Sequence, residues 1–247
     1  MIPRRALAAL ALLLAACGDA AVTPTDGGAG TADLGPTDDL PVTPDYVPAG
    51  YTLVPFLSDR ATTHTFDTFD PTDPAQSVLV KGRDYAAVLD VAPVTSGGNT
   101  ARIVLDLLEK DTPITVNSFV FLALHHYFDG LAFHRVIPRF VAQAGDPNTL
   151  DPDTSQWGYG GPGYNYGVEI VDGLNFDSVG VVGMAHAQPL DSNGSQFFIT
   201  LTPQPGLDGN FTVFGRVTEG LGVLPTIVQG QPPDNPTRMT RVYIVAR

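Results

Sequence analysis

One run of sequence constrains the fold of this chain more than any other stretch, the segment FHRVIPRFVAQAGD at residues 133–146. Its side chains alternate on both sides of a break at Pro138-Arg139, which predicts two short strands. Residues two apart on a strand share a face, so Phe133 and Arg135 should lie on one side, with Val141 and Gln143 together after the break. The pattern therefore predicts a strand pair that carries one arginine and one glutamine.

A second region lies downstream, with MAHA at 184–187 and NGSQFFI at 193–199. Together the two regions resemble the signature regions of the cyclophilin family of peptidyl-prolyl cis-trans isomerases. The resemblance covers about Tyr85 to Arg247. It implies a mainly β fold, a closed eight-stranded antiparallel barrel capped by two helices.

Local patterns indicate the same class of fold. Apolar runs predict strands at 85–91 and 101–107, joined by a turn at 96–99. A helix should follow, since Thr112 can cap and Pro113 suits the first helical position. One face of this helix should pack inward at Val116, Phe119, Val120, Ala123 and Tyr127.

The C-terminal half predicts further short strands and one more helix. The helix is expected at 219–229, although Pro225 would start, kink or shorten it. Many short strands with two helices are typical of a closed antiparallel barrel. The strands are expected at 179–185, 196–201, 211–217 and 238–246.

The charge of the chain excludes one class of partner. Its 247 residues hold 13 basic and 26 acidic residues, a formal net charge of −13. Nucleic-acid binding needs clustered Lys and Arg, so nucleic acid is not expected as a partner. The acidity is interpreted as a means of solubility.

The N-terminal sequence is typical of an export signal. A short basic start with Arg4 and Arg5 precedes an apolar stretch at 6–16 that is too short to span a bilayer. The only cysteine, Cys17, ends a Leu-Ala-Ala-Cys sequence that resembles a bacterial lipobox, which implies lipidation of Cys17. An ordinary secretory signal and a twin-arginine signal are the alternatives. We expect an extracytoplasmic protein of the cell envelope, held at a bacterial membrane by lipid only.

Four segments follow from these patterns. Residues 1–17 are the predicted signal peptide. Residues 18–50 contain acids, Pro, Thr and Gly but no Lys or Arg, and are expected to be a disordered tether. Residues 51–83 should form an irregular extension on the domain surface, and residues 84–247 the cyclophilin-like domain.

The resemblance also assigns site residues. Arg135 would be catalytic, and Gln143 would orient it or bind the substrate backbone. Arginine suits such chemistry because it stays charged and offers several rigid donors. The match to the family places the proline pocket at Phe140, Val141, Phe198 and Leu207, the substrate-binding backbone at Ala185, His186 and Ala187, and two more groove positions at Gln196 and Phe211.

Three positions depart from the family pattern. His186 stands where asparagine is usual, but catalysis should survive because the contact there is largely through the backbone. Gly206 stands where human-type members carry a tryptophan important for cyclosporin binding, and Phe211 replaces a common His or Tyr. Weak cyclosporin inhibition is therefore expected.

The function expected from the resemblance is isomerisation of X–Pro bonds in unfolded or flexible proteins outside the cytoplasm, assisting their folding. A non-catalytic proline-peptide-binding chaperone or scaffold is the alternative. The five histidines show no metal-ligand spacing, so neither a metal nor a cofactor is expected. The partners expected are proline-containing polypeptides, and the protein should be a monomer.

Overall fold

The computed structural model describes residues 44–58, 64–93 and 100–247. The predicted signal peptide, Cys17, most of the predicted tether and the predicted turn at 96–99 lie outside the described residues. None of the helices in the described ranges combines the length and the apolar character that crossing a membrane requires.

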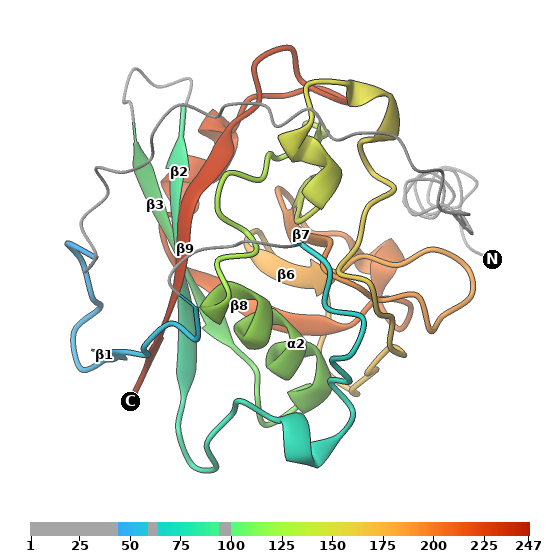
Figure 1. Cartoon of the computed structure of the whole chain (residues 1–247). Coiled ribbons are helices and arrows are strands. Elements are labelled where there is room, and N and C mark those ends of the chain that lie inside the picture. The colour runs from blue at the N-terminus through green and yellow to red at the C-terminus, as the bar shows by residue number, and fades with distance from the viewer. Residues whose placement is uncertain (1–43, 59–63, 94–99) are drawn as a thin grey trace, which may run out of the picture.

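The strands form one strongly curled antiparallel sheet in the order β1-β9-β2-β3-β8-β6-β7-β5-β4 (Figure 1). Isolated bridges join Ala132 to Arg238 and Val136 to Gly230, so the β4 end of the sheet meets β9 and the segment before it. The prediction of a mainly β, antiparallel barrel is confirmed. The strands are β1 (Thr52–Leu53), β2 (Tyr85–Ala92), β3 (Ala101–Leu107), β4 (Arg135–Val136), β5 (Val141–Ala144), β6 (Val181–Met184), β7 (Phe197–Thr200), β8 (Val213–Glu219) and β9 (Arg238–Ala246).

The number of strands differs from the expected eight because the N-terminal extension contributes β1. Thr52 pairs with Ala246 and Leu53 with Val245, at the edge of β9. An unpaired edge strand invites association with other chains, and β1 covers part of that edge. The other eight strands all lie after residue 84.

The extension and the residues just before it also cover the outer face of the sheet. Tyr46, Tyr51, Leu53 and Phe56 pack on an apolar layer made by β2, β3 and β9. The Tyr243 hydroxyl donates to Tyr46 O at 2.8 Å, so packing against the barrel already begins before residue 50.

The main helix, α2 (Pro113–Leu124), packs against the sheet at the barrel core. Its Phe119 ring lies 5.5 Å from Phe197 and 5.4 Å from Phe214, ring centre to ring centre. Thr112 occupies the N-cap position and Pro113 the first helical position, as predicted, but the Thr112 side chain makes no capping hydrogen bond. The Glu169 carboxylate instead accepts from the backbone N–H groups of Ile114 and Thr115.

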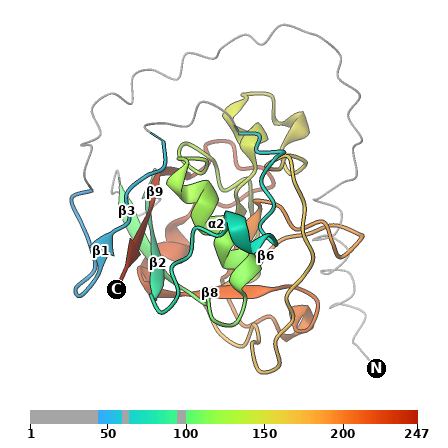
Figure 2. The ribbon, with the colours of Figure 1, turned by 60° about the horizontal axis from the view of Figure 1, so that its bottom comes forward.

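Both sides of α2 are covered, whereas the sequence pattern predicted one inward face. The short 3₁₀ helix η1 (Pro74–Gln76) and the segment around it lie beside α2 in both ribbon views (Figures 1 and 2). Phe69 stacks on Phe121 with 3.6 Å between ring centres, and Asn117 donates to Pro71 O. Helical periodicity could not reveal this second layer because it comes from a distant segment.

The second helix is shorter than expected. Residues 221–226 form a 3₁₀ helix rather than an α-helix over 219–229, since Pro225 inside it lacks an N–H and its ring crowds the preceding turn. Gly220, with a φ of +86°, precedes it. The 3₁₀ helices of the described chain are η1 (Pro74–Gln76), η2 (Pro147–Leu150), η3 (Thr154–Gln156), η4 (Pro205–Leu207) and η5 (Leu221–Thr226).

The packing of the extension on α2 predicts that Phe69→Ala lowers the free energy of unfolding by about 3 kcal/mol, the cost of removing a buried aromatic side chain. Urea denaturation followed by circular dichroism measures it. Leu57→Ala is the control, because Leu57 also belongs to the extension but is 54% exposed, and it should change stability by less than about 0.5 kcal/mol. Equal, small effects of both changes would contradict a cooperative role for the extension.

Candidate active site

The β4–β5 pair positions the predicted catalytic residues. Arg135 lies directly opposite Gln143 in the register, and the strands are joined by a turn at Pro138-Arg139. The prediction of two strands with a break is thus confirmed. Both side chains are buried, Arg135 to 5% exposure and Gln143 completely.

A chain of side-chain amides runs from the guanidinium into the protein. Arg135 Nη1 donates to Gln143 Oε1 at 3.4 Å, and Gln143 Nε2 donates to Gln196 Oε1 at 3.0 Å. Gln196 Nε2 in turn donates to the carbonyl oxygens of Gly158 and Gly160, each at 2.9 Å. Gln196 was predicted only as a position beside the groove. In the structure it also accepts a hydrogen bond from Gln143, one of the two predicted catalytic residues.

The loop at the far end of this chain is tied down by Asp146. Its carboxylate accepts from Asn148 N at 2.8 Å and from Gly158 N. Asp146 is fully buried, and burial raises the pKa of its carboxyl. Sequence reasoning missed this role, because nothing in the run 133–146 shows which backbone groups its last residue meets.

The predicted pocket residues come together in one apolar cluster at the side of the sheet. Phe198 is its centre, with Phe176 at 5.4 Å and Phe211 at 5.6 Å between ring centres. The predicted members of this cluster are Phe140, Val141, Ala185, Phe198, Leu207 and Phe211, and the structure adds Phe176, Val181 and Val213. The added residues had no motif to mark them, so only the three-dimensional packing identifies them.

The guanidinium and the apolar cluster are adjacent. Arg135 Cζ lies 5.7 Å from the centre of the Phe140 ring. A fixed cation with several N–H donors beside an apolar surface can bind a proline ring and hold a carbonyl or a ring nitrogen at the same time.

The segment Ala185–Ala187 follows β6 and is held from several sides. Ala185 N donates to Gln196 O and Ala187 N to Ser192 Oγ, both at 2.9 Å, so these two N–H groups are engaged within the protein. The His186 ring is buried, lies 4.5 Å from the Phe211 ring, and has Nε2 2.8 Å from Asn210 O. His186 thus links this segment to the loop before β8. The assignment of the segment to substrate binding stays a prediction.

The turn between β4 and β5 has an unusual backbone. Arg139 has a φ of +60°, a left-handed conformation that costs a non-glycine residue about 1 kcal/mol. Arg139 O accepts from Thr202 Oγ1 at 2.7 Å and from Gln204 Nε2 at 3.0 Å. The turn is therefore fixed against the segment that leads to η4 and Leu207.

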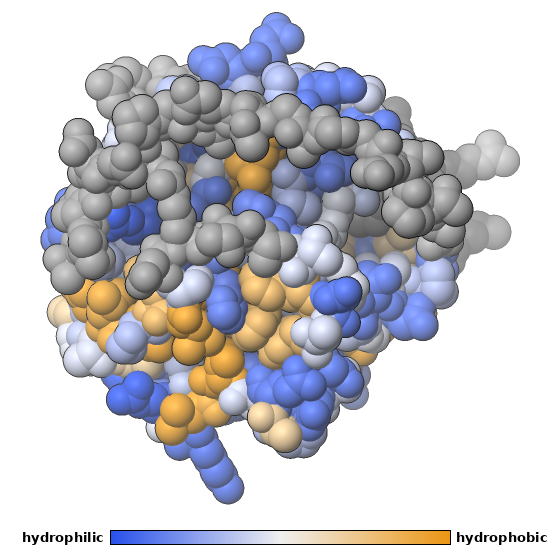
Figure 3. Space-filling view, viewed as in Figure 1, coloured by the Kyte–Doolittle hydropathy of each residue, from blue (hydrophilic) through white to orange (hydrophobic). Residues whose placement is uncertain are grey.

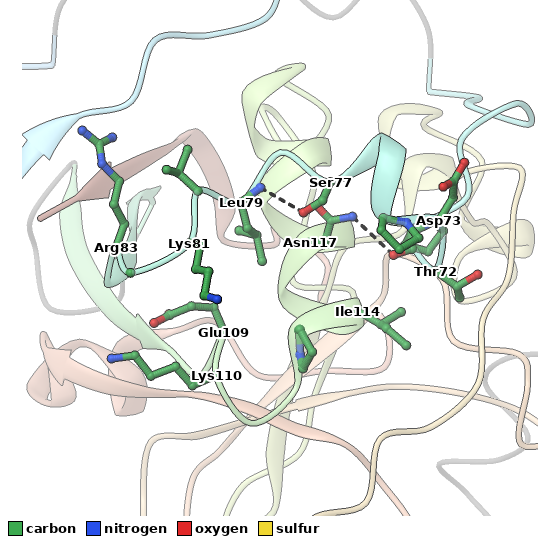
Figure 4. A pocket seen from close by; sticks show the side chains of 15 residues that line it. Thr72, Asp73, Ser77, Leu79, Lys81, Arg83, Glu109, Lys110, Ile114 and Asn117 are labelled. Carbon is green, nitrogen blue, oxygen red and sulfur yellow. Dashed lines mark hydrogen bonds between the residues drawn. The ribbon is translucent and has the colours of Figure 1, made fainter.

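A cleft of about 410 Å³ lies elsewhere, between the extension and the start of α2 (Figure 4). Asn117 joins its walls by donating to Pro71 O and accepting from Val78 N. Val80, at the edge of this cleft, is 58% exposed. Figure 3 shows a broad apolar area on the lower half of the visible face. No predicted site residue lines this cleft, so it is separate from the candidate active site.

No group of three or more His, Cys, Asp or Glu that could hold a metal ion occurs in residues 44–58, 64–93 and 100–247. Cys17, the predicted lipidation site, lies outside the described residues.

The family model described as "Cyclophilin type peptidyl-prolyl cis-trans isomerase/CLD" matches residues 93–246. A peptidyl-prolyl cis-trans isomerase of Helicobacter pylori is 41% identical over 160 residues, which covers 64% of this chain and 91% of the relative. The human "Peptidyl-prolyl cis-trans isomerase-like 1" is 43% identical over 122 residues, covering 49% of this chain and 70% of the relative.

Solved structures agree with the sequence relatives. A Cryptosporidium parvum cyclophilin-type peptidyl-prolyl cis-trans isomerase, solved in the presence of the dipeptide Ala-Pro, has a TM-score of 0.52 and 27% sequence identity. The match covers 63% of this chain and 98% of that protein.

His134, next to Arg135, yields a prediction on pH. Burial, helped by the positive charge of Arg135, lowers the pKa of His134 from 6.5 to about 4. The unfolded chain therefore takes up a proton near pH 6.5 that the folded chain accepts only near pH 4. The stability contributed by neutral His134 is present above pH 6.5 and should decline by up to about 3 kcal/mol toward pH 4.

Urea denaturation at several pH values measures this decline. His134→Gln removes the titrating group, so the variant should show a smaller loss of stability between pH 7 and 4. Parallel pH dependences in the two proteins would contradict a neutral, buried His134.

Proposed function

Since this chain belongs to the cyclophilin-type peptidyl-prolyl cis-trans isomerases, we propose that it accelerates X–Pro isomerisation in unfolded or flexible proteins outside the cytoplasm. The family membership makes the chain an isomerase of this type. The substrates, the location and the role in folding are the proposed parts. The observation that supports the proposal most is the buried Arg135, held by Gln143 beside the apolar cluster around Phe198.

The reaction sets the physical demand on the site. Rotation about an X–Pro bond disrupts amide conjugation, and its barrier is about 18–20 kcal/mol. Uncatalysed exchange takes roughly 10–100 s at 25 °C. No bond breaks, so the enzyme must bind the twisted state more tightly than either planar state. An acceleration of about five orders of magnitude requires about 7 kcal/mol of such selective binding.

Arg135 can supply part of this binding. In the twisted state the prolyl nitrogen becomes more basic and the carbonyl loses its amide character, so a guanidinium N–H can donate toward either. If the guanidinium is already oriented, no side chain has to move to make this contact. The hydrogen bonds from Arg135 to Gln143 and from Gln143 to Gln196 provide that orientation.

The apolar cluster can hold the proline ring while the preceding residue turns. Phe140, Phe198 and Leu207 are each less than 10% exposed and belong to one cluster, which offers a rigid apolar floor. The Cryptosporidium parvum relative was solved with Ala-Pro, and a proline-containing peptide is the proposed ligand here.

The location is proposed from the N-terminal sequence. A basic start, an apolar stretch and Cys17 at the lipobox position favour export and attachment of lipid to Cys17. The predicted tether would then connect the lipid with the isomerase domain. An isomerase held in this way would meet exported chains while their prolyl bonds still equilibrate, and so assist their folding.

The catalytic role of Arg135 predicts that Arg135→Ala lowers the isomerisation rate about 10²- to 10³-fold, the usual effect of removing one oriented donor. Exchange NMR on a short Ala-Pro peptide measures the rate. Arg135→Lys keeps the charge but loses the planar fork, and should also be strongly impaired. Arg247→Ala, a half-exposed arginine paired with Asp84, is the matched control and should retain the full rate.

Two results would change this proposal. Background exchange with a folded wild-type protein that still binds the peptide would favour a non-catalytic peptide-binding chaperone or scaffold. Normal exchange in Arg135→Ala would remove Arg135 from the mechanism.

Lipid attachment predicts that the full chain, expressed in a bacterium, is labelled by palmitate and partitions into a detergent phase. Cys17→Ser should abolish the label and move the protein to the aqueous phase. An unlabelled wild-type chain in the aqueous phase would contradict the lipoprotein proposal and leave an ordinary secretory signal.

A further inference from the structure

Two non-glycine residues of the described chain have a left-handed backbone, His126 and Arg139. The side chain of His126 makes contacts that offset the strain, since Nδ1 lies 2.9 Å from Asp129 Oδ2 and the ring stacks on Phe56 at 3.9 Å. Arg139 is different. Its side chain is exposed and forms no ion pair with any carboxylate of the described residues.

The backbone of Arg139 is nevertheless held firmly. Its carbonyl accepts from Thr202 and Gln204, and Phe140 O accepts from Leu201 N at 2.8 Å. Glycine would adopt this conformation without strain and keep the same backbone bonds. The arginine side chain therefore brings no visible gain to the fold, and such outliers next to a site point to a role in function.

The sheet register places Arg139 relative to the residues that are predicted to bind the peptide. Ala144 pairs with Phe197, which pairs with Met184, so the segment 185–187 lies beyond this end of β7. Val141 pairs with Thr200 at the other end, where the turn with Arg139 lies.

A peptide that has the residues before proline on 185–187 and its ring on the cluster around Phe198 therefore leaves toward Arg139. The span of β5 is only about 10 Å, since a strand rises about 3.3 Å per residue. The first or second residue after the proline would reach the exposed guanidinium.

We propose that Arg139 is a specificity-determining residue that selects substrates with an acidic side chain in the first or second position after the proline. This inference rests on the proposed function, because it concerns the same site. The chain as a whole is strongly acidic and repels such peptides. The exposed guanidinium of Arg139 would offset this repulsion locally, because Arg139 directly precedes Phe140, whose ring lies 5.7 Å from Cζ of the buried Arg135.

The test uses three peptides and two readouts. Acetyl-Ala-Ala-Pro-Glu-Glu-amide, acetyl-Ala-Ala-Pro-Lys-Lys-amide and acetyl-Glu-Glu-Pro-Ala-Ala-amide are titrated into the full chain, and NMR gives both the affinity and the exchange rate. The peptide with acids after the proline should be preferred about two- to fivefold at low ionic strength, as for an exposed ion pair, and the preference should vanish near 1 M salt.

Variants assign the preference to one side chain. Arg139→Glu should reverse it, and Arg139→Gly should abolish it while raising the melting temperature, since the strain is relieved. Arg83→Glu is the matched control, because Arg83 is also exposed, directly follows a turn and pairs with no carboxylate of the described residues, and the change in net charge is identical. It should keep the preference.

The outcomes separate this inference from the isomerase activity. Selective binding without accelerated exchange would contradict the activity and still support the role of Arg139. Equal affinities and rates for the three peptides, or a preference that Arg139→Glu leaves unchanged, would overturn the inference.

Discussion

A guanidinium can be buried only where oriented acceptors meet it, and the candidate site depends on this constraint. Gln143 turns its oxygen toward Arg135 and its amide nitrogen toward Gln196, which in turn donates to the carbonyl oxygens of Gly158 and Gly160. Reversing either amide would set like groups against each other. The carbonyl oxygens of the loop therefore determine the direction of every hydrogen bond in this series, and Asp146 fixes the loop.

The register of the strands brings the hydrogen-bonded polar side chains and the apolar cluster together. β5 and β7 are adjacent, so Gln143 is paired with Phe198, and the polar chain runs directly beside the apolar cluster. The aromatic core around Phe119 supports the other face of the sheet. The N-terminal extension adds a further layer over α2 and the edge of β9, outside the part of the chain that the family model matches.

The sequence predicted the elements better than their contacts. Alternation in 133–146 and periodicity in the main helix depend on local residues, and both elements occur as expected. The second cover of α2, the Glu169 cap and the strand β1 depend on residues far away in the chain. Similarly, the pocket residues with a motif were found, whereas Phe176 and Asp146 acquire their places only through packing.

The most direct measurement is a double-mutant cycle between Gln196 and Arg135, read as the rate of prolyl exchange. If Gln196 works by orienting Arg135, Gln196→Ala should slow the wild-type protein clearly but have almost no further effect in Arg135→Ala. Circular dichroism would confirm that each variant is folded. Losses that multiply independently would contradict this, and would mean that Gln196 and Arg135 contact the substrate separately.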